Sequence, residues 1–157
     1  MSSGQPSGEW PIAGPWSREQ IQQYLDACRT PIRIACLAPS GYPTIVSMWY
    51  VFDGERLWSA THRDARIVRL LTSDSRVGFE VAGNEMPYRG VRGNGEVQLH
   101  VERGADILDC VLSKYLQKPG SGLERWLRSR SADEVAIELV PTRVSAWDYG
   151  GRMADAY

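Results

Sequence analysis

Two tight turns, each joining a pair of alternating strands, constrain the fold of this chain most strongly. Residues 32–38 and 44–52 show the apolar alternation of strands, and a turn rich in Pro and Gly separates them. A second turn at Asp53 and Gly54 leads into a third strand, residues 56–60. Because connections this short make neighbouring strands run antiparallel, the first half of the chain is predicted to form an antiparallel meander.

The second strand of this meander is apolar on both faces. Val46 and Met48 alternate with Ile45 and Trp49 between residues 44 and 52. Strands with two apolar faces are typically covered on both sides. We therefore expect residues 44–52 to form one continuous strand without a face open to water.

Three more strands and four helices complete the predicted order. The strands are expected at residues 76–82, 91–101 and 134–147, and the helices begin at Ser17 and near Arg63 and span 105–117 and 123–129. Gly93 and Gly95 indicate a bend or the close approach of another backbone, and Pro141 a bulge or bend. This order predicts an α+β fold, a barrel of six mainly antiparallel strands with flanking helices.

Length and composition indicate one globular domain. The chain has 157 residues, and the segment 1–14, rich in Ser, Gly and Pro, is expected to be a mobile tail in front of a domain at 15–157. The net charge of −1 gives no bulk attraction to nucleic acid or an anionic membrane. No run approaches the roughly 18 apolar residues of a membrane span, and the polar N-terminus does not resemble a signal peptide.

The cysteines and histidines point away from disulfide and metal chemistry. Cys28, Cys36 and Cys110 are odd in number and widely spaced, which argues against a disulfide framework or a zinc motif. With only His62 and His100 present, we expect no metal site. The chain is therefore expected to be a soluble protein of a reducing compartment, the cytoplasm.

Three arginines follow the third strand at three-residue spacing. Arg63, Arg66 and Arg69 lie on roughly one stripe of the predicted helix, with the first two near its start. Free backbone N–H groups and the helix dipole there favour an anion, and guanidiniums strengthen that preference. From spacing alone, a phosphate site and a solvated arginine face both remain open.

Aromatic residues with a polar edge are unusually frequent. The chain has six Trp and seven Tyr but only two Phe. Such rings are favoured at interfaces and in pockets for planar ligands, although each of them can equally fill the core.

These segments, in this order and spacing, resemble the pyridoxamine 5'-phosphate oxidase-like family of FMN-binding split barrels. The resemblance covers about residues 33–147 and rests on four stretches: RIACLAPSGYPTIVSMWYVFDGERLWSAT, ARIVRLLTSDSRVGFEV, PYRGVRGNGEVQL and VPTRVSAWD. It implies a split β-barrel that forms a homodimer, with two flavin sites at the subunit interface.

The resemblance also implies which residues bind the cofactor. The end of the third strand and the start of the following helix would hold the phosphate, the second strand would run beside the ring, and the last strand would reach the partner's flavin. The implied positions are Ser47, Met48, Trp49, Tyr50, Ala60, Thr61, Arg63, Arg66 and Trp147.

The chain departs from the family pattern at two places. The family commonly has a basic residue directly after the position of Arg66, where this chain has Ile67. Arg63 or Arg69 could take over that role. The basic residue that pyridoxamine-phosphate oxidases carry at the end of the second strand is replaced by Trp49 and Tyr50. Oxidation of vitamin B6 itself is therefore not expected.

The resemblance thus predicts an FMN-dependent oxidoreductase acting on a small molecule. The loop residues Tyr88 and Arg89 are candidate substrate contacts, and no obligatory acid–base residue is expected because the cofactor carries the redox chemistry. One alternative is a deazaflavin reductase, whose anionic cofactor tail Arg89 and Arg92 could meet. Another is a non-catalytic flavin- or haem-binding protein, in which His62 or His100 would be the axial ligand.

Overall fold

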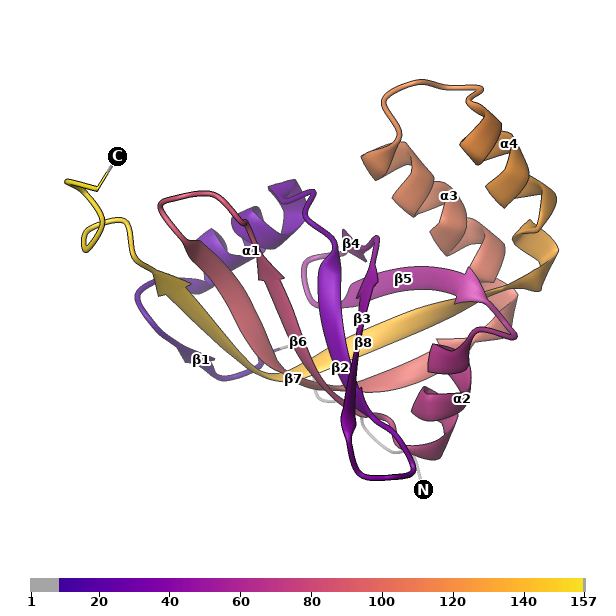
Figure 1. Cartoon of the computed structure of the whole chain (residues 1–157), viewed down its shortest axis with the longest axis horizontal. Helices are drawn as coiled ribbons and strands as arrows, with labels where there is room; N and C mark the ends of the chain where they lie inside the picture. Colours follow the sequence, from indigo (N-terminus) through magenta and orange to yellow (C-terminus); the bar gives the residue numbers. More distant parts are fainter. Residues whose placement is uncertain (1–8, 157) are drawn as a thin grey trace.

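The computed structural model describes residues 9–156, which fold into one curled sheet with helices at its two ends (Figure 1). The strands are β1 (Ile12–Ala13), β2 (Ile32–Leu37), β3 (Pro43–Met48), β4 (Val51–Phe52), β5 (Leu57–His62), β6 (Arg76–Ala82), β7 (Arg89–His100) and β8 (Glu134–Asp148). The helices are α1 (Arg18–Ala27), α2 (Arg66–Ser73), α3 (Gly104–Tyr115) and α4 (Gly122–Ser129), with short 3₁₀ turns at Val101–Arg103 and Ser131–Asp133. The predicted α+β split barrel is confirmed.

The order of the strands makes the sheet an almost closed ring. Neighbouring strands follow the path β3-β2-β6-β7-β8-β5-β4, and every pair on this path is antiparallel. The two ends of the path, β3 and β4, are consecutive in the chain and joined only by Trp49 and Tyr50. The covalent chain therefore bridges the opening that the hydrogen-bond ladders leave.

The strand predicted at 44–52 is consequently two strands. Tyr50 turns fully into the core, where its hydroxyl donates to the carbonyl oxygens of Leu25 at 2.6 Å and Cys28 at 3.2 Å. This anchor breaks the ladder after Met48, so that β3 pairs with β2 whereas β4 pairs with β5. Together with the two-residue strand β1, this break makes an eight-stranded sheet where six strands were expected.

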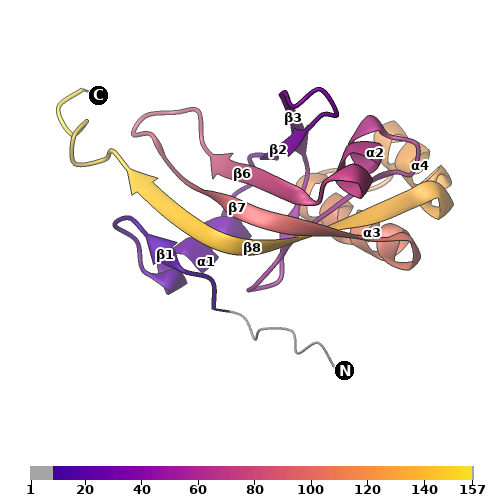
Figure 2. The same cartoon turned by 90° about the horizontal axis from the view of Figure 1, so that it is seen from below.

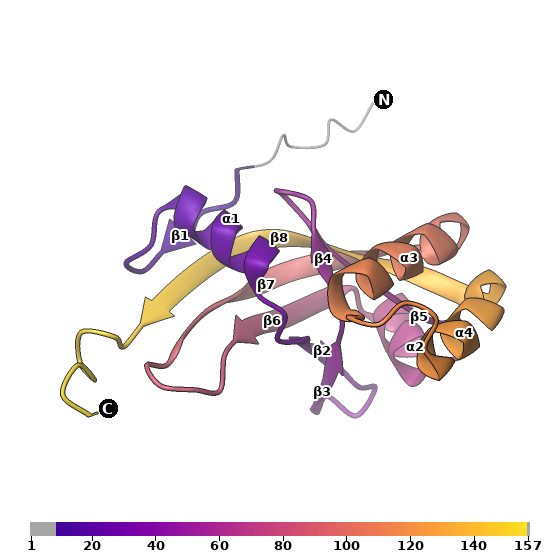
Figure 3. The ribbon, with the colours of Figure 1, turned by 90° about the horizontal axis from the view of Figure 1, so that it is seen from above.

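The core fills the inside of the curled sheet. The first helix begins after Ser17, as predicted, with its backbone capped by Ser17 and Gln20, and it buries Ile21 and Leu25. A second apolar cluster lies on the other side of β5 and β8, where α3 packs against Trp58 and Ala136. Seen from below and from above, α1 lies toward one end of the sheet, whereas α2, α3 and α4 gather at the other (Figures 2 and 3).

The long pair of β7 and β8 contains the predicted bulge. The register shifts between Asn94 and Gly95, opposite Pro141. A Cβ atom on Gly93 would lie 2.1 Å from the backbone oxygen of Arg143, and one on Gly95 would lie 2.7 Å from that of Val140. Both glycines are thus required by close backbone approach, as their placement in the strand predicted.

Two expectations about surfaces need correction. Residues 9–14 of the predicted tail belong to the folded domain, because Trp10 is buried and β1 pairs in parallel with β8; residues 1–8 lie outside the described part of the chain. The outer face of β3 is not covered in the single chain, where Ile45 is 69% exposed. Among the described residues, no helix is long and apolar enough to cross a membrane.

Candidate functional site

A cavity of about 640 Å³ lies where the ring of strands is split. One wall is β3, which pairs only with β2. The other is the end of β5, Ala60–His62, which extends beyond the two residues that pair with β4, Leu57 and Trp58. Within residues 9–156, the facing edges of both strands therefore have no strand partner, and their backbone N–H and C=O groups remain available. Helices α2, α3 and α4 complete the lining.

The structure brings most of the predicted cofactor residues to this one cavity. Those that line it are Ser47, Met48, Trp49, Ala60, Thr61 and Arg66. They come from three separate segments of the sequence, so their meeting is a consequence of the fold. The cavity is otherwise lined mainly by aliphatic and aromatic side chains, as a site for a planar ligand requires.

Arg66 is the cationic group at the start of α2. Its side chain is exposed, and it makes no ion pair or side-chain hydrogen bond with any described residue. The N-cap of this helix is Ala65, which has no side chain to accept from the first N–H groups, and the first turn carries no acidic residue. A guanidinium and uncapped N–H groups thus converge on the cavity, which is the arrangement that an anion needs.

The other two arginines of the stripe are engaged elsewhere. Arg63 pairs with Asp133 at 2.9 Å, and Arg69 donates to the backbone oxygen of Asp64 at 2.8 Å. Neither lines the cavity. Ile67, directly after Arg66, is 4% exposed and packs in the core, and it also lines the cavity as an apolar side chain.

Two of the remaining cofactor predictions fall outside the cavity. Tyr50 is buried in the core by the hydrogen bonds described above. Trp147 lies near the end of β8, with its ring 5.3 Å from that of Tyr149 and under the guanidinium of Arg92. The buried indole N–H of Trp147 has no acceptor among the described residues.

The predicted substrate contacts lie at a different place. Arg89 lines a separate cavity of about 480 Å³ beside Tyr24 and the loop 83–87. Tyr88 is exposed, and its backbone oxygen accepts from the N–H of Tyr149 at 2.9 Å. Within one chain, therefore, neither Tyr88 nor Arg89 joins the cavity at the split.

The sequence reasoning missed the contribution of α4 to the cavity. Leu123, Trp126 and Leu127 lie at i, i+3 and i+4, and all three line the cavity. Leu123 and Trp126 are still 48% and 53% exposed where they line the cavity, whereas Leu127 also packs against the second apolar cluster. The guanidinium of Arg130 lies 4.5 Å from the centre of the Trp126 ring. The apolar spacing was visible in the sequence, but nothing in it indicated what the stripe faces.

Sequence reasoning also missed Glu134 as a cavity residue, and it considered His62 only as a haem ligand. His62 and Glu134 are paired across β5 and β8, and both line the cavity. Glu134 is 6% exposed, and burial raises the pKa of its carboxyl above the usual value. No local motif marks a glutamate at the first residue of a strand as a cavity group, so only the fold reveals it.

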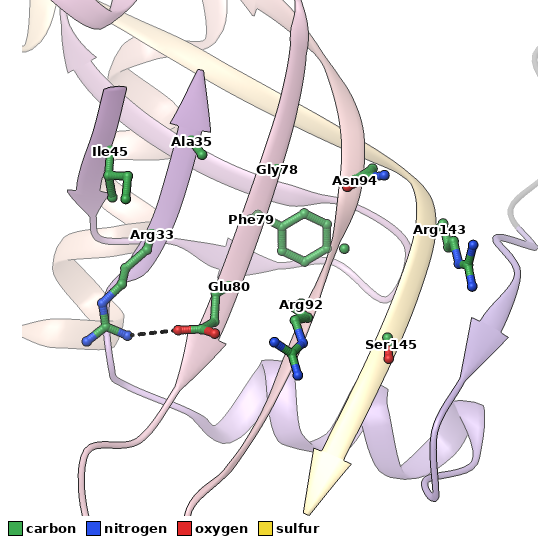
Figure 4. A pocket seen from close by; sticks show the side chains of 11 residues that line it. Arg33, Ala35, Ile45, Gly78, Phe79, Glu80, Arg92, Asn94, Arg143 and Ser145 are labelled. Atoms are coloured by element: carbon green, nitrogen blue, oxygen red, sulfur yellow. Dashed lines mark ion pairs between the residues drawn. The ribbon is translucent and has the colours of Figure 1, made fainter. Parts of the chain in front are cut away.

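A second concave surface lies on the outer face of the sheet (Figure 4). It has a volume of about 550 Å³ and a floor of small residues, Ala35 and Gly78 among them. Arg33 lies 3.6 Å from Glu80 across β2 and β6, and Arg92 and Arg143 border the same surface. The exposed side chain of Ile45 forms its edge at β3, the strand that also lines the cavity at the split.

Comparison with solved structures shows the same fold in several proteins. A conserved hypothetical protein from Mycobacterium tuberculosis is 23% identical, with 86% of each chain covered and a TM-score of 0.70. A protein named F420 reductase is also 23% identical, with 84% of this chain and 98% of the other covered and a TM-score of 0.64. An FAD-binding protein from Mesorhizobium loti is 17% identical, with 83% and 92% covered and a TM-score of 0.61.

The sequence itself matches a family profile. A comparison with curated proteins gives no match. The profile described as pyridoxamine 5'-phosphate oxidase matches residues 17–148, which include the whole sheet path from β2 to β8 and the cavity at its split. This chain therefore belongs to the pyridoxamine 5'-phosphate oxidase family.

Proposed function

We propose that the cavity at the split binds a flavin-type cofactor, FMN in the first instance, and that the protein is a flavin-dependent oxidoreductase acting on a small molecule. The observation that carries this proposal is the convergence of Arg66, at an uncapped helix start, with a large apolar cavity between two open strand edges. A phosphate and a planar ring require these two environments side by side.

The residues of the cavity have distinct tasks in this proposal. Arg66 and the first N–H groups of α2 would hold the phosphate, with Thr61 as a hydroxyl donor beside them. The edge of β3 would supply backbone donors and acceptors to the ring. Trp49, whose ring stacks on that of Tyr115 at 5.1 Å, is a rigid wall. The bound flavin would supply the redox chemistry, and the protein its position and the exclusion of water.

A second copy of the chain is the partner that we propose for the outer face of the sheet. Ile45 is an exposed aliphatic side chain beside a floor of small residues, and the adjacent Arg33 and Glu80 offer both charges to a copy of themselves. Sedimentation of the wild type should therefore give a dimer at micromolar concentration, and Ile45→Glu should give a monomer. A monomeric wild type would contradict the dimer.

A deazaflavin is the second candidate cofactor. It is favoured by Arg92 and Arg143, which are exposed at the outer surface and form no ion pair within residues 9–156. A longer anionic tail crossing β3 could reach them. A deazaflavin is also supported by the similar fold of the protein named F420 reductase.

The test is a parallel titration of the purified protein with FMN, FAD, a deazaflavin and haem. Quenching of ligand fluorescence reports the first three, and a change in the Soret band reports haem, for which His62 is the one histidine that lines the cavity among the described residues. We expect FMN to bind most tightly. Failure of FMN and deazaflavin alike to bind would overturn the proposal, and tight binding of haem alone would favour a haem protein.

A further inference from the structure

The carboxyl group of Glu134 faces the cavity without a partner. Glu134 is the first residue of β8 and is 6% exposed. Neither of its carboxyl oxygens makes a hydrogen bond or an ion pair with any group in the part of the chain that the structure describes. By contrast, Glu138, the other buried glutamate of this strand, contacts both Arg56 and His100.

An unpaired buried carboxyl is costly, and folded proteins rarely keep one without a use. Its charged form loses solvation by water, and no local donor replaces that loss. Three titratable side chains lie close enough to act on its charge. Arg130 and His62 favour the ionised form of the carboxyl, and Asp133 disfavours it. None of them is within bonding distance of its oxygens, which still reach solvent, so a molecule that fills the cavity and displaces water from them must supply a donor in its place.

The surroundings of Glu134 indicate which kind of ligand would carry that hydrogen-bond donor. Besides Arg130 and His62, which lie near Glu134, the cavity that it lines offers apolar side chains, among them Leu108 and Val111 of α3 and the aromatic Trp126 of α4. A hydrated cation or a flexible polar chain gains little from such a wall, whereas a planar ring buries its faces there. The chemistry that fits both features is an N–H group on the edge of a planar ring.

We propose that Glu134 accepts a hydrogen bond from a ring N–H of the ligand and thereby makes the cavity selective for rings that carry this donor. The proposal rests on the flavin-type function proposed above and deepens it. Flavin and deazaflavin rings share one such group, the imide N–H between two carbonyls, so the inference holds for either cofactor. Glu134 acts in binding, and no bond is made or broken in this role.

The experiment compares FMN with its analogue methylated at the imide nitrogen. Both are titrated by fluorescence quenching against the wild type, Glu134→Leu, Glu134→Gln and the control Glu96→Gln, whose carboxyl is exposed on β7 outside the cavity. The wild type and the control should prefer FMN by about ten- to a hundred-fold, the usual effect of a hydrogen bond to a charged group. The Leu variant should bind the two ligands within about threefold of each other, because it has no acceptor left to lose. The Gln variant should keep part of the preference through its amide oxygen.

The outcomes separate this inference from the proposed function. An unchanged preference in Glu134→Leu, or no preference in the wild type, would overturn the role of Glu134 while leaving flavin binding intact. Failure of every folded protein to bind FMN or a deazaflavin would overturn both. Thermal unfolding of each variant by circular dichroism verifies that a loss of binding is not a loss of fold, and the Gln variant, which keeps the size of the side chain, serves if the Leu variant does not fold.

Discussion

The guanidinium of Arg63 lies 2.9 Å from a carboxylate oxygen of Asp133, whereas Arg66, three residues later, has no charged partner among the described residues. The ion pair ties the loop before α2 to the turn before β8. Of the three arginines at residues 63, 66 and 69, it leaves Arg66 as the one that lines the cavity without a charged partner among the described residues.

Arg66→Ala is therefore expected to lower the affinity for FMN by about ten- to a hundred-fold, because it removes a charge-assisted hydrogen bond to phosphate. Arg63→Ala is the matched control and should change the affinity by no more than about threefold, since its charge is already paired and largely exposed. Fluorescence titration at one ionic strength measures both. Equal effects of the two substitutions would mean that Arg66 does not bind the phosphate and is a solvated surface residue.

The buried carboxylate of Glu138 predicts a second pair of contrasting substitutions. Arg56 and His100 both contact Glu138, which is 2% exposed. Among the described residues, removing the guanidinium in Arg56→Met leaves His100 as the one hydrogen-bond partner of the Glu138 carboxylate and should lower the free energy of unfolding by about 2–4 kcal/mol. The ion pair of Arg33 with Glu80 is more exposed, so Arg33→Met should cost less than about 1 kcal/mol. Urea unfolding measures both. Similar decreases in the free energy of unfolding would mean that the burial of Glu138 does not make its ion pair more important for stability than the exposed one.

Close backbone packing predicts a strong effect of one added methyl group. A Cβ atom at residue 93 would meet the backbone oxygen of Arg143 at 2.1 Å, and backbone cannot move aside without disturbing the pair of β7 and β8. Gly93→Ala should destabilise the fold by about 2 kcal/mol or more. Gly83→Ala, with nothing within 4 Å, should change stability by less than about 0.5 kcal/mol. Thermal melts of the two variants provide the comparison. A melting temperature of Gly93→Ala equal to that of the wild type would show that the backbone of β8 shifts to accommodate the methyl group.

The raised pKa of Glu134 predicts how stability changes with pH. Burial raises the pKa in the folded state above its value in the unfolded chain. The favourable effect of the neutral carboxyl is therefore complete below the unfolded pKa and is lost as the pH rises through the folded pKa. Glu134→Gln removes this titration. Its stability relative to the wild type should rise as the pH increases above about 4.3, the ordinary pKa of a glutamate carboxyl, measured by urea unfolding without ligand. A difference that stays constant with pH would mean that the carboxyl does not titrate in that range.

Much of the fold was predictable because its signals are local. The turn at Asp53 and Gly54, the capping residues Ser17 and Gln20, and the glycines of β7 each act on neighbours close in sequence or on one facing strand. The break between β3 and β4 was not predictable. It depends on the hydrogen bonds of Tyr50 to the end of α1, more than twenty residues away in the chain.

The candidate site divides in the same way. Thr61 and Arg66 were predicted because the resemblance to the family implies a phosphate at the end of the third strand and the start of the following helix, where free backbone N–H groups favour an anion. Glu134 and Trp126 were missed because their importance depends on which elements the topology brings to the split. The roles of Trp147, Tyr88 and Arg89 stay predictions, since they lie away from this cavity in the single chain.

The near-closure of the sheet by Trp49 and Tyr50 has a mechanical consequence. The cavity walls lie at the two ends of one sheet, so apart from this dipeptide the backbone hydrogen-bond ladder joins them only through β2, β6, β7 and β8. A molecule seated between them would act as a clamp, because it contacts both ends at once and resists their separation. Amide hydrogens of β3 and of the end of β5 should then exchange more slowly with solvent in the presence of ligand, while those of β7 and β8 change little.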